Sequence, residues 1–395
     1  MFKKAWRIIQ CHDTEILLFL PFMAGIYIHI PFCKQACYYC DFHFSTSLKY
    51  KDDMMTALLK EIMLQKGYLD GETIETIYFG GGTPSLLKAE EINLLIDRIG
   101  QYHVISSNAE ITLEANPDDL DTEKVKQLRQ TIINRFSIGI QSFFDEDLLW
   151  MNRAHRSREA EASVKRVQDA GFENITADLI YGYPLLTDQK WKHNLQQIFD
   201  LNIPHISAYS MTVEPQTALD SFIKKKVYPP MNEMQSAEQF IVLMEQMQQH
   251  GYEQYEISNY CIPGNYSRHN SNYWKGIKYL GIGPSAHSFN GEARQWNIAN
   301  NARYIQSLTT DKIPAEWEEL TEADRLNEYI MTSLRTIWGL DLTKLESIRK
   351  GAADELKQDA EEPFYNNWIT QKDNIITLTN DGKLYADKIA SDLFF

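Results

Sequence analysis

Three cysteines lie close together in the stretch CKQACYYC, where Cys33, Cys37 and Cys40 have the spacing C-x3-C-x2-C. Three thiolates on one short loop can occupy three corners of a cubane iron–sulfur cluster and leave the fourth iron without a protein ligand. In catalytic zinc sites an open coordination position allows a small molecule to bind the metal, and the same reasoning applies to an open iron. The spacing therefore predicts a [4Fe–4S] cluster that binds a ligand directly.

The same three cysteines also fit a zinc site that His29 or His43 completes, or three unrelated thiols. No second C-x2-C element and no H-x3-H element follows in the chain, so a conventional zinc arrangement is less favoured. The chain has five cysteines in 395 residues, a small and odd number that disfavours a disulfide framework. This cysteine usage favours a reducing compartment, and we expect a cytoplasmic protein.

Six short β-rich runs alternate with stretches of helical periodicity from residue 25 onward, a pattern typical of parallel βα units. The expected strands cover residues 25–30, 74–79, 110–114, 135–140, 175–181 and 205–211. Residues 51–67 and 158–171 have helical periodicity, and Gly171 is a stop signal at the end of the second stretch. Six such repeats predict an α/β fold built on a partial (β/α)6 barrel similar to a TIM barrel.

Polar side chains follow the expected strands at their carboxyl ends, where barrels of this kind gather their chemistry. In chain order, these groups are the cysteine cluster (33–40), the GGGTP loop (80–84), Glu114, Gln141, Asp178, and Tyr209 with Ser210. Because all six strands deliver polar or ligand-type groups to the same rim, the sequence indicates a binding or catalytic site there.

The composition of the chain disfavours one class of function, nucleic-acid binding. The formal net charge is −15, which leaves no basic excess to neutralise phosphates and disfavours nucleic-acid binding. The apolar fraction of 44% is ample for a core in a chain of this length. These values are those of an ordinary globular protein with an acidic surface.

The first residues resemble a short signal peptide, because Lys3, Lys4 and Arg7 precede the apolar run ILLFLPF. The run is too short to span a bilayer, no A-x-A cleavage site follows, and an expected strand begins a few residues later. We therefore interpret residues 1–22 as an N-terminal extension or a mis-called start ahead of MAGIYIHI. Cys11 lies in this segment and receives no role.

The composition changes to a helical, charged character after about residue 300. The closing stretch NIITLTNDGKLYADKIASDLFF has an NDG turn between an apolar run and a helix. This pattern predicts a small helical, winged-helix-like domain over residues 301–395, beside a barrel domain over residues 23–300. The acidity of the smaller domain argues against DNA binding.

Together with the GGGTP loop, the cysteine stretch resembles the radical S-adenosylmethionine (SAM) superfamily. In that superfamily the methionine part of SAM binds the open iron, and an electron from the reduced cluster cleaves SAM to a 5′-deoxyadenosyl radical. The resemblance implies cluster ligands at Cys33, Cys37 and Cys40. It also implies that SAM contacts Gly81, Gly82 and Thr83 and, by resemblance to the coproporphyrinogen dehydrogenase branch, Tyr27, Glu114, Gln141, Arg153 and Asp178.

The segments IYIHIPFC, YCDF, ANPDDL, IGIQSF and ADLIYGYP resemble the oxygen-independent coproporphyrinogen oxidase-like group of that superfamily. The true oxidases of this group carry a fourth cysteine two positions after the third and a longer N-terminal arm. Phe42 stands at the position of the fourth cysteine in this chain. This departure argues against decarboxylation of coproporphyrinogen III, which stays the alternative activity.

The segment RHNSNYW (268–274) resembles the H-N-x-x-Y-W motif of the HemW family of heme chaperones. In that family the motif is associated with heme binding, so the resemblance implies heme contacts from His269, Asn270, Tyr273 and Trp274, with His269 as the axial ligand. His287 in the following YLGIGPSAHSF is a second candidate ligand. Cys261 is expected to pack as a small apolar residue.

The resemblance implies a cytoplasmic heme chaperone that carries a [4Fe–4S] cluster and SAM, binds heme and hands it to heme-requiring respiratory proteins. A heme donor protein, a homodimer and peripheral contact with membrane-bound acceptors are compatible with this interpretation, and nucleic acid is not an expected partner. A radical SAM enzyme that acts on an unrelated substrate is the third reading.

Overall fold

The computed structural model describes residues 23–395. The predicted N-terminal extension, residues 1–22, and Cys11 lie outside the described residues. Among residues 23–395, none of the helices combines the length and the apolar character that crossing a bilayer requires.

The main sheet has twelve strands, in the order β12-β11-β10-β9-β1-β2-β3-β4-β5-β6-β8-β7. Strands β1 to β6 are mutually parallel and adjacent in chain order, which confirms the predicted partial (β/α)6 barrel. They are β1 (Met23–Ile30), β2 (Thr73–Gly81), β3 (Ile105–Ala115), β4 (Arg135–Gln141), β5 (Ile175–Tyr181) and β6 (His205–Ser210). Each of the six overlaps a strand expected from the sequence, and β3 begins five residues earlier than expected.

Shorter strands extend the sheet on both sides. On the β6 side lie β7 (Glu253–Glu256) and β8 (Asn259–Cys261), and on the β1 side lie β9 (Lys278–Ile282), β10 (His287–Phe289), β11 (Ala293–Asn297) and β12 (Ala315–Glu319). The sequence patterns did not indicate these strands, because three to five residues carry too little alternation to be distinguished from a loop.

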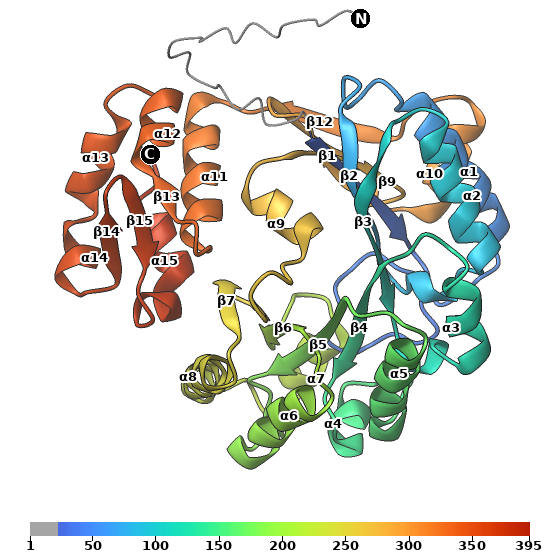
Figure 1. The fold of residues 1–395 in the computed structure, drawn as a ribbon, viewed down its shortest axis with the longest axis horizontal. Coiled ribbons are helices and arrows are strands. Elements are labelled where there is room, and N and C mark those ends of the chain that lie inside the picture. Colours follow the sequence, from blue (N-terminus) through green and yellow to red (C-terminus); the bar gives the residue numbers. More distant parts are fainter. Residues whose placement is uncertain (1–22) are drawn as a thin grey trace, which may run out of the picture.

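Helices cover the outer face of the sheet (Figure 1). They are α1 (Lys51–Leu64), α2 (Ala89–Gly100), α3 (Thr122–Leu128), α4 (Asp145–Trp150), α5 (Ser157–Asp169), α6 (Asp188–Asp200), α7 (Ala218–Lys224), α8 (Glu233–Gln249) and α10 (Asn301–Thr309). Side chains fix several of their starts, since Asp121, Thr187 and Asn300 each accept a hydrogen bond from a first-turn amide. The predicted stop of α5 is confirmed, because Gly171 follows it with a positive φ of 84°.

The inner face of β1 to β6 is mostly polar. Alternate residues of a strand point to opposite faces, and on these strands one set consists of apolar core residues such as Ile26, Ile28 and Phe79. The other set faces the barrel interior and includes Tyr27, Thr76, Tyr78, Glu110, Glu114, Arg135, Ser137, Thr176, Asp178, His205 and Ser207. A barrel lined this way is built to hold polar groups or ligands, because a barrel core normally consists of branched apolar side chains.

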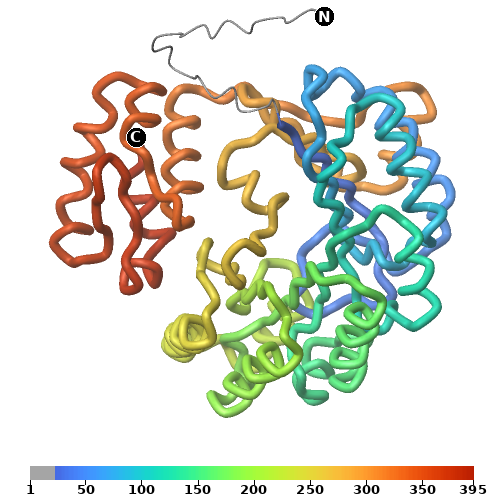
Figure 2. Tube along the Cα trace, viewed as in Figure 1, coloured from blue at the N-terminus to red at the C-terminus, as the bar shows by residue number. Residues whose placement is uncertain are grey.

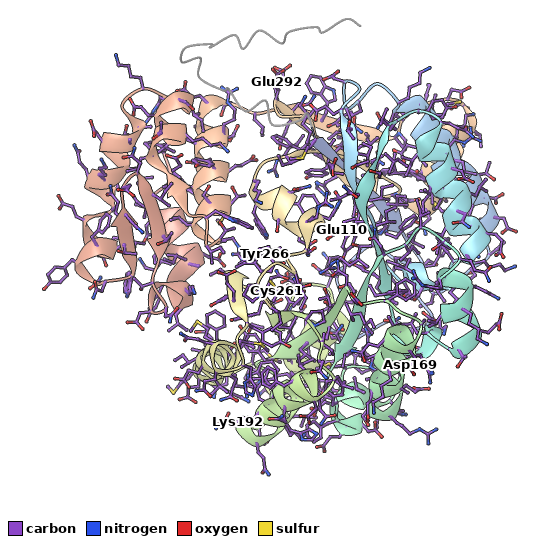
Figure 3. The ribbon with its side chains drawn as sticks, viewed as in Figure 1. Glu110, Asp169, Lys192, Cys261, Tyr266 and Glu292 are labelled. Atoms are coloured by element: carbon purple, nitrogen blue, oxygen red, sulfur yellow. The ribbon has the colours of Figure 1, made fainter. Side chains whose placement is uncertain are left out.

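Helix α9 (Arg268–Trp274) lies against the inner side of this sheet, between β2 and the C-terminal helices (Figures 1 and 2). Its first-turn amides are held by one buried carboxylate. This carboxylate belongs to Glu110 of β3, which is labelled in Figure 3. Glu110 accepts hydrogen bonds from the backbone N–H groups of Arg268 at 3.0 Å and His269 at 2.9 Å. A carboxylate at a helix N-terminus is favourable for the helix dipole as well as for the unpaired amides.

The C-terminal part has a hydrophobic core of its own, which includes Leu326, Leu345, Leu356, Ile376 and Ile389. It contains α11 (Glu322–Leu334), α12 (Leu342–Ile348), α13 (Ala352–Asp359), α14 (Glu361–Tyr365), α15 (Ala386–Asp392) and a small antiparallel sheet of β13 (Leu340–Asp341), β15 (Ile375–Leu378) and β14 (Ile369–Lys372). Because β12 still pairs with β11, we propose a domain boundary near residue 320 in place of residue 301.

Candidate functional site

The loop after β1 carries all three clustered cysteines, at the carboxyl end of the barrel. Several contacts from distant elements hold it. Tyr38 N donates to Met151 O at 3.1 Å, and Leu219 N donates to Tyr38 O at 2.8 Å. Lys34 forms an ion pair with Asp118 at 2.8 Å. The short stretch between Cys33 and Cys40 is therefore anchored by three separate parts of the barrel rim.

Asn152 makes three polar contacts to this loop. Its side-chain amide donates to Ala36 O at 2.7 Å, and its Oδ1 and carbonyl oxygen accept hydrogen bonds from Gln35 Nε2 at 2.7 and 3.0 Å. Asn152 has a φ of 58°, a left-handed conformation that asparagine adopts more readily than most residues. Sequence reasoning missed this residue, because nothing in its local pattern links it to the cysteines.

The arrangement of the thiols does not suit a mononuclear zinc site. Within residues 23–395, no three His, Cys, Asp or Glu side chains are grouped closely enough to hold one metal ion. His29 Nε2 bonds His43 O at 2.8 Å, and His43 Nε2 bonds Asn301 Oδ1 at 2.7 Å. A cubane cluster does not require such a tight group, because its three thiolates bind three different irons.

Arg153 supplies positive charge beside the thiols. Its Nη1 lies 3.5 Å from Cys37 Sγ, while its Nη2 donates to Asn116 Oδ1 at 2.7 Å and Gly139 O at 2.8 Å. Burial raises the pKa of Cys33 and raises the pKa of Cys40 to about 12. A partly buried guanidinium beside the thiols fits the negative charge of a cluster ligated by three thiolates.

Two carboxyl groups in the barrel interior have no cationic partner. Among the described residues, neither Glu114 nor Asp178 forms an ion pair; Glu114 accepts hydrogen bonds from Tyr78 OH at 2.8 Å and Gly81 N at 3.2 Å, and Asp178 accepts one from Ser137 Oγ at 3.1 Å. Burial raises the pKa of Glu114 to about 8 and that of Asp178 to about 7. A ligand that brings positive charge, such as the amino group and sulfonium of SAM, fits this pair.

The GGGTP loop approaches the end of β1 closely. A Cβ atom on Gly82 would lie 2.6 Å from Phe32 O, and one on Gly81 would lie 2.6 Å from the His29 ring. Gly81 also has a φ of 102°, which side chains rarely tolerate. These glycines are thus required by packing at the barrel mouth, and Asn116 Nδ2 fixes the next residue by donating to Thr83 Oγ1 at 3.2 Å.

The structure brings most of the predicted SAM positions to one end of the barrel. Tyr27 of β1 stacks on Tyr78, which bonds Glu114, and Arg153 contacts Gly139, whose Cβ position lies 3.0 Å from Gln141 Nε2. Gln141 has a φ of 66° at the end of β4. Asn116, which bridges Thr83 and Arg153, was not predicted, although it lies in the ANPDDL segment.

The H-N-x-x-Y-W residues do not share one environment. His269 is 2% exposed, and its Nδ1 and Nε2 hydrogen-bond to Thr76 Oγ1 and Tyr273 OH, both at 2.8 Å. Burial lowers the pKa of His269 to about 3, with a further contribution from Arg135. Trp274 turns instead toward the C-terminal helices, where the Arg335 guanidinium lies 5.5 Å from its ring centroid.

The other candidates lie elsewhere on the sheet. His287, at the start of β10, is exposed and lies beside Trp296, with ring centroids 6.3 Å apart. Cys261 is fully buried in β8. Phe42, at the position of the fourth cysteine in the true oxidases, is 67% exposed.

Comparisons with known proteins agree with this fold. A family model described as the Radical SAM superfamily matches residues 27–198. The structure of coproporphyrinogen III oxidase (HemN) from Escherichia coli has a TM-score of 0.83 at 23% identity and covers 94% of this chain and 90% of that chain. This likeness confirms the α/β fold.

Similarity in sequence identifies the family. The heme chaperone HemW of Bacillus subtilis is 33% identical over 93% of this chain and 98% of its own length. The heme chaperone HemW of Escherichia coli is 30% identical, over 92% of this chain and 96% of its own length. On the strength of these similarities, the chain belongs to the HemW family of the radical SAM superfamily.

Proposed function

We propose that this protein is a heme chaperone that holds a [4Fe–4S] cluster on Cys33, Cys37 and Cys40 and binds SAM beside it. The observation that carries the proposal is a continuous inner face of the sheet. This face is polar on β1 to β6, next to the cysteine loop, and becomes aromatic on β9 to β11. The relatives that share the whole length of the chain are named heme chaperones.

The polar side provides the groups for SAM. Glu114 and Asp178 would bind its positive charge, and Arg153 would bind its carboxylate while it compensates the cluster. Tyr27, Gly81, Gly82, Thr83 and Gln141 would contact SAM from the strand ends around it. When bound, the cluster supplies an electron and an open iron to SAM. The residues of this chain would orient SAM and the cluster relative to each other and would exclude water from the carboxyl groups of Glu114 and Asp178.

The aromatic side provides a surface for a porphyrin. Tyr273 of α9 meets Tyr279 of β9 edge-to-face at 4.6 Å, and Tyr279 lies 6.4 Å from Phe289 of β10. Flat apolar rings of this kind contact a porphyrin favourably through edge-to-face and offset geometries. Asn270 and Trp274 stay predicted heme contacts of the α9 motif.

The partners follow from the proposed activity. Heme is the cargo, and heme-requiring proteins of respiratory chains are the proposed acceptors. A heme donor protein, a homodimer and peripheral contact with membrane-bound acceptors fit the same role, and the proposed compartment is the cytoplasm. The net charge of −15 agrees with the absence of nucleic acid from this set.

The test is an anaerobic titration of the cluster-reconstituted protein with heme, followed by visible absorption. Saturable binding with a stoichiometry near one, followed by transfer of the heme to an apo respiratory heme protein, is the expected result. Binding that neither saturates nor depends on the folded protein would contradict the proposal.

A parallel assay tests the alternative activity, which is the decarboxylation of coproporphyrinogen III. The chain shares its fold with HemN, a coproporphyrinogen III oxidase. The protein is incubated with coproporphyrinogen III, SAM and a reductant under anaerobic conditions. We expect no vinyl product, because Phe42 replaces the fourth cysteine of the true oxidases. Formation of protoporphyrinogen IX would favour the oxidase and overturn the chaperone proposal.

A further inference from the structure

The availability of each histidine decides which one can bind iron. An imidazole that ligates heme must present a free nitrogen lone pair to an open space. His269 does not do so, because both of its ring nitrogens are hydrogen-bonded and its side chain is enclosed by Thr76, Tyr78 and Tyr273. Its geometry is that of a histidine that fastens α9 to the barrel interior.

Only three of the histidines in residues 23–395 are exposed: His193, His250 and His287. His250 hydrogen-bonds Gln246 O at 2.8 Å on its own helix. His193 lies on the outer helix α6, 5.2 Å from the Phe144 ring. Within the described part of the chain, His287 alone combines exposure, no side-chain hydrogen bond and a place on the sheet.

The strand register places His287 on the inner face. Tyr279 pairs with Gly25 of β1, and Phe289 pairs with Tyr279, so these residues continue the face that carries Tyr27. His287 is two residues from Phe289 on the same strand and therefore shares this face. Trp296 lies directly opposite His287 on β11 and points the same way.

Gly281 of β9 lies directly against the backbone of His287 on β10. It pairs with Tyr27, and a Cβ atom there would lie 2.0 Å from His287 O, so the two backbones are in close contact. No side chain on β9 separates His287 from Tyr27 at this level.

We propose that His287, and not the motif histidine His269, supplies the axial nitrogen for heme, with Trp296 as its aromatic neighbour. The inference rests on the proposed function, because it names the ligand of the heme that the chaperone carries. An iron-bound imidazole stands roughly perpendicular to the porphyrin, and the Trp296 ring is inclined 29° to that of His287. The indole would therefore meet the porphyrin edge-to-face, a favourable geometry.

The charges around His287 are consistent with a neutral ligand. Burial lowers the pKa of His287 below its usual value, and the charge of Arg294 on the neighbouring strand β11 lowers it further. Arg294 is itself paired with Glu328 at 2.8 Å, so the proposal assigns it no role in holding propionates.

The experiment compares heme binding by full-length, cluster-reconstituted variants. We expect His287→Ala to bind heme at least about tenfold more weakly than wild type, and His287→Met to keep binding with an altered Soret band and resonance Raman spectrum. His193→Ala is the matched control, an exposed histidine beside an aromatic ring on the outer surface, and it should bind like wild type. His269→Gln, which can keep both hydrogen bonds, should also bind like wild type.

The outcomes distinguish a failure of the proposed chaperone function from a failure of the assignment of His287 as the heme ligand. If the wild type itself fails to bind heme, the chaperone function fails. If the wild type binds but His287→Ala and His287→Met leave affinity and spectrum unchanged, the assignment to His287 is overturned. Loss of binding in His269→Gln alone, with cluster content and melting temperature preserved, would return the ligand to the motif.

Discussion

Gln35 and Asn152 are 117 positions apart in the chain, and Gln35 Nε2 donates to Asn152 Oδ1 at 2.7 Å, which joins the cysteine loop to the end of α4. Asn152 returns a hydrogen bond to Ala36 O, so the residues between Cys33 and Cys37 are held from both sides. The cysteine spacing alone would leave this loop free to change shape, and the pair fixes the shape before any iron arrives.

Asn152→Ala should therefore weaken the hold on the cluster without removing a ligand. The lost hydrogen bonds and the left-handed backbone conformation together cost about 2 kcal/mol, which corresponds to roughly thirtyfold faster loss of cluster absorption under a chelator. Asn202→Ala is the matched control, because Asn202 has a similar φ of 50° but no contact with the loop. Equal rates of cluster loss in the two variants would show that the hydrogen bonds of Asn152 to the cysteine loop do not help to retain the cluster.

Cys33→Ala, Cys37→Ala and Cys40→Ala should each abolish the [4Fe–4S] cluster, because no other thiol of the described residues lies on this loop. Iron content and the visible charge-transfer absorption provide the measurement. Cys261→Ala is the control, since its thiol is buried in β8, and it should lower stability while it retains the cluster. Survival of the absorption in Cys40→Ala would exclude Cys40 as a ligand.

Glu61 should make stability depend on pH. It is fully buried on α1 and accepts hydrogen bonds from Gly283 N at 2.8 Å, Asn297 Nδ2 at 2.7 Å and Tyr304 OH. Burial nevertheless raises its pKa from 4.5 to about 7. The folded state then holds a proton that the unfolded state releases, so this contribution is full below pH 4.5 and is lost as pH rises through 7.

From pH 5 to pH 8 the loss from Glu61 is about 2 kcal/mol in the free energy of unfolding. Urea titrations at both pH values should show a smaller decrease for Glu61→Gln than for wild type. The comparison of the two decreases removes the contributions of other titrating groups. Identical decreases in both proteins would mean that Glu61 does not change its protonation in this range.

Arg335 joins the C-terminal unit to the barrel edge. Its Nε and Nη2 lie 3.2 and 3.1 Å from Glu256 Oε1, and the Glu256 side chain is almost completely buried. Arg335→Met should lower the free energy of unfolding by about 3 kcal/mol, because it leaves a buried carboxylate without its cation. The double variant Arg335→Met/Glu256→Gln should recover most of the loss.

Lys388→Met is the control for this pair, because it removes one partner of the exposed pair with Asp392 and should leave unfolding unchanged. If neither Arg335→Met nor Lys388→Met lowered the free energy of unfolding, apolar contacts would hold the C-terminal unit to the barrel edge instead of the ion pair.

The sequence by itself determined the features that depend on short stretches of chain. The proposed cluster ligands lie within eight consecutive residues. The strands β1 to β6 could be predicted because alternating or continuous apolar runs of this length are typical of strands. The motifs around Gly81, Glu114 and Asp178 were found for the same reason, since each ends or follows such a strand.

Only the tertiary structure decided which of these groups are available. His269 belongs to a recognisable motif, but its ring nitrogens are hydrogen-bonded to Thr76, 193 positions away, and to Tyr273. His287 has no comparable motif, but the register of β9, β10 and β11 places it on the inner face. Hydrogen-bond partners and exposure are set by residues far apart in sequence, and no local pattern records them.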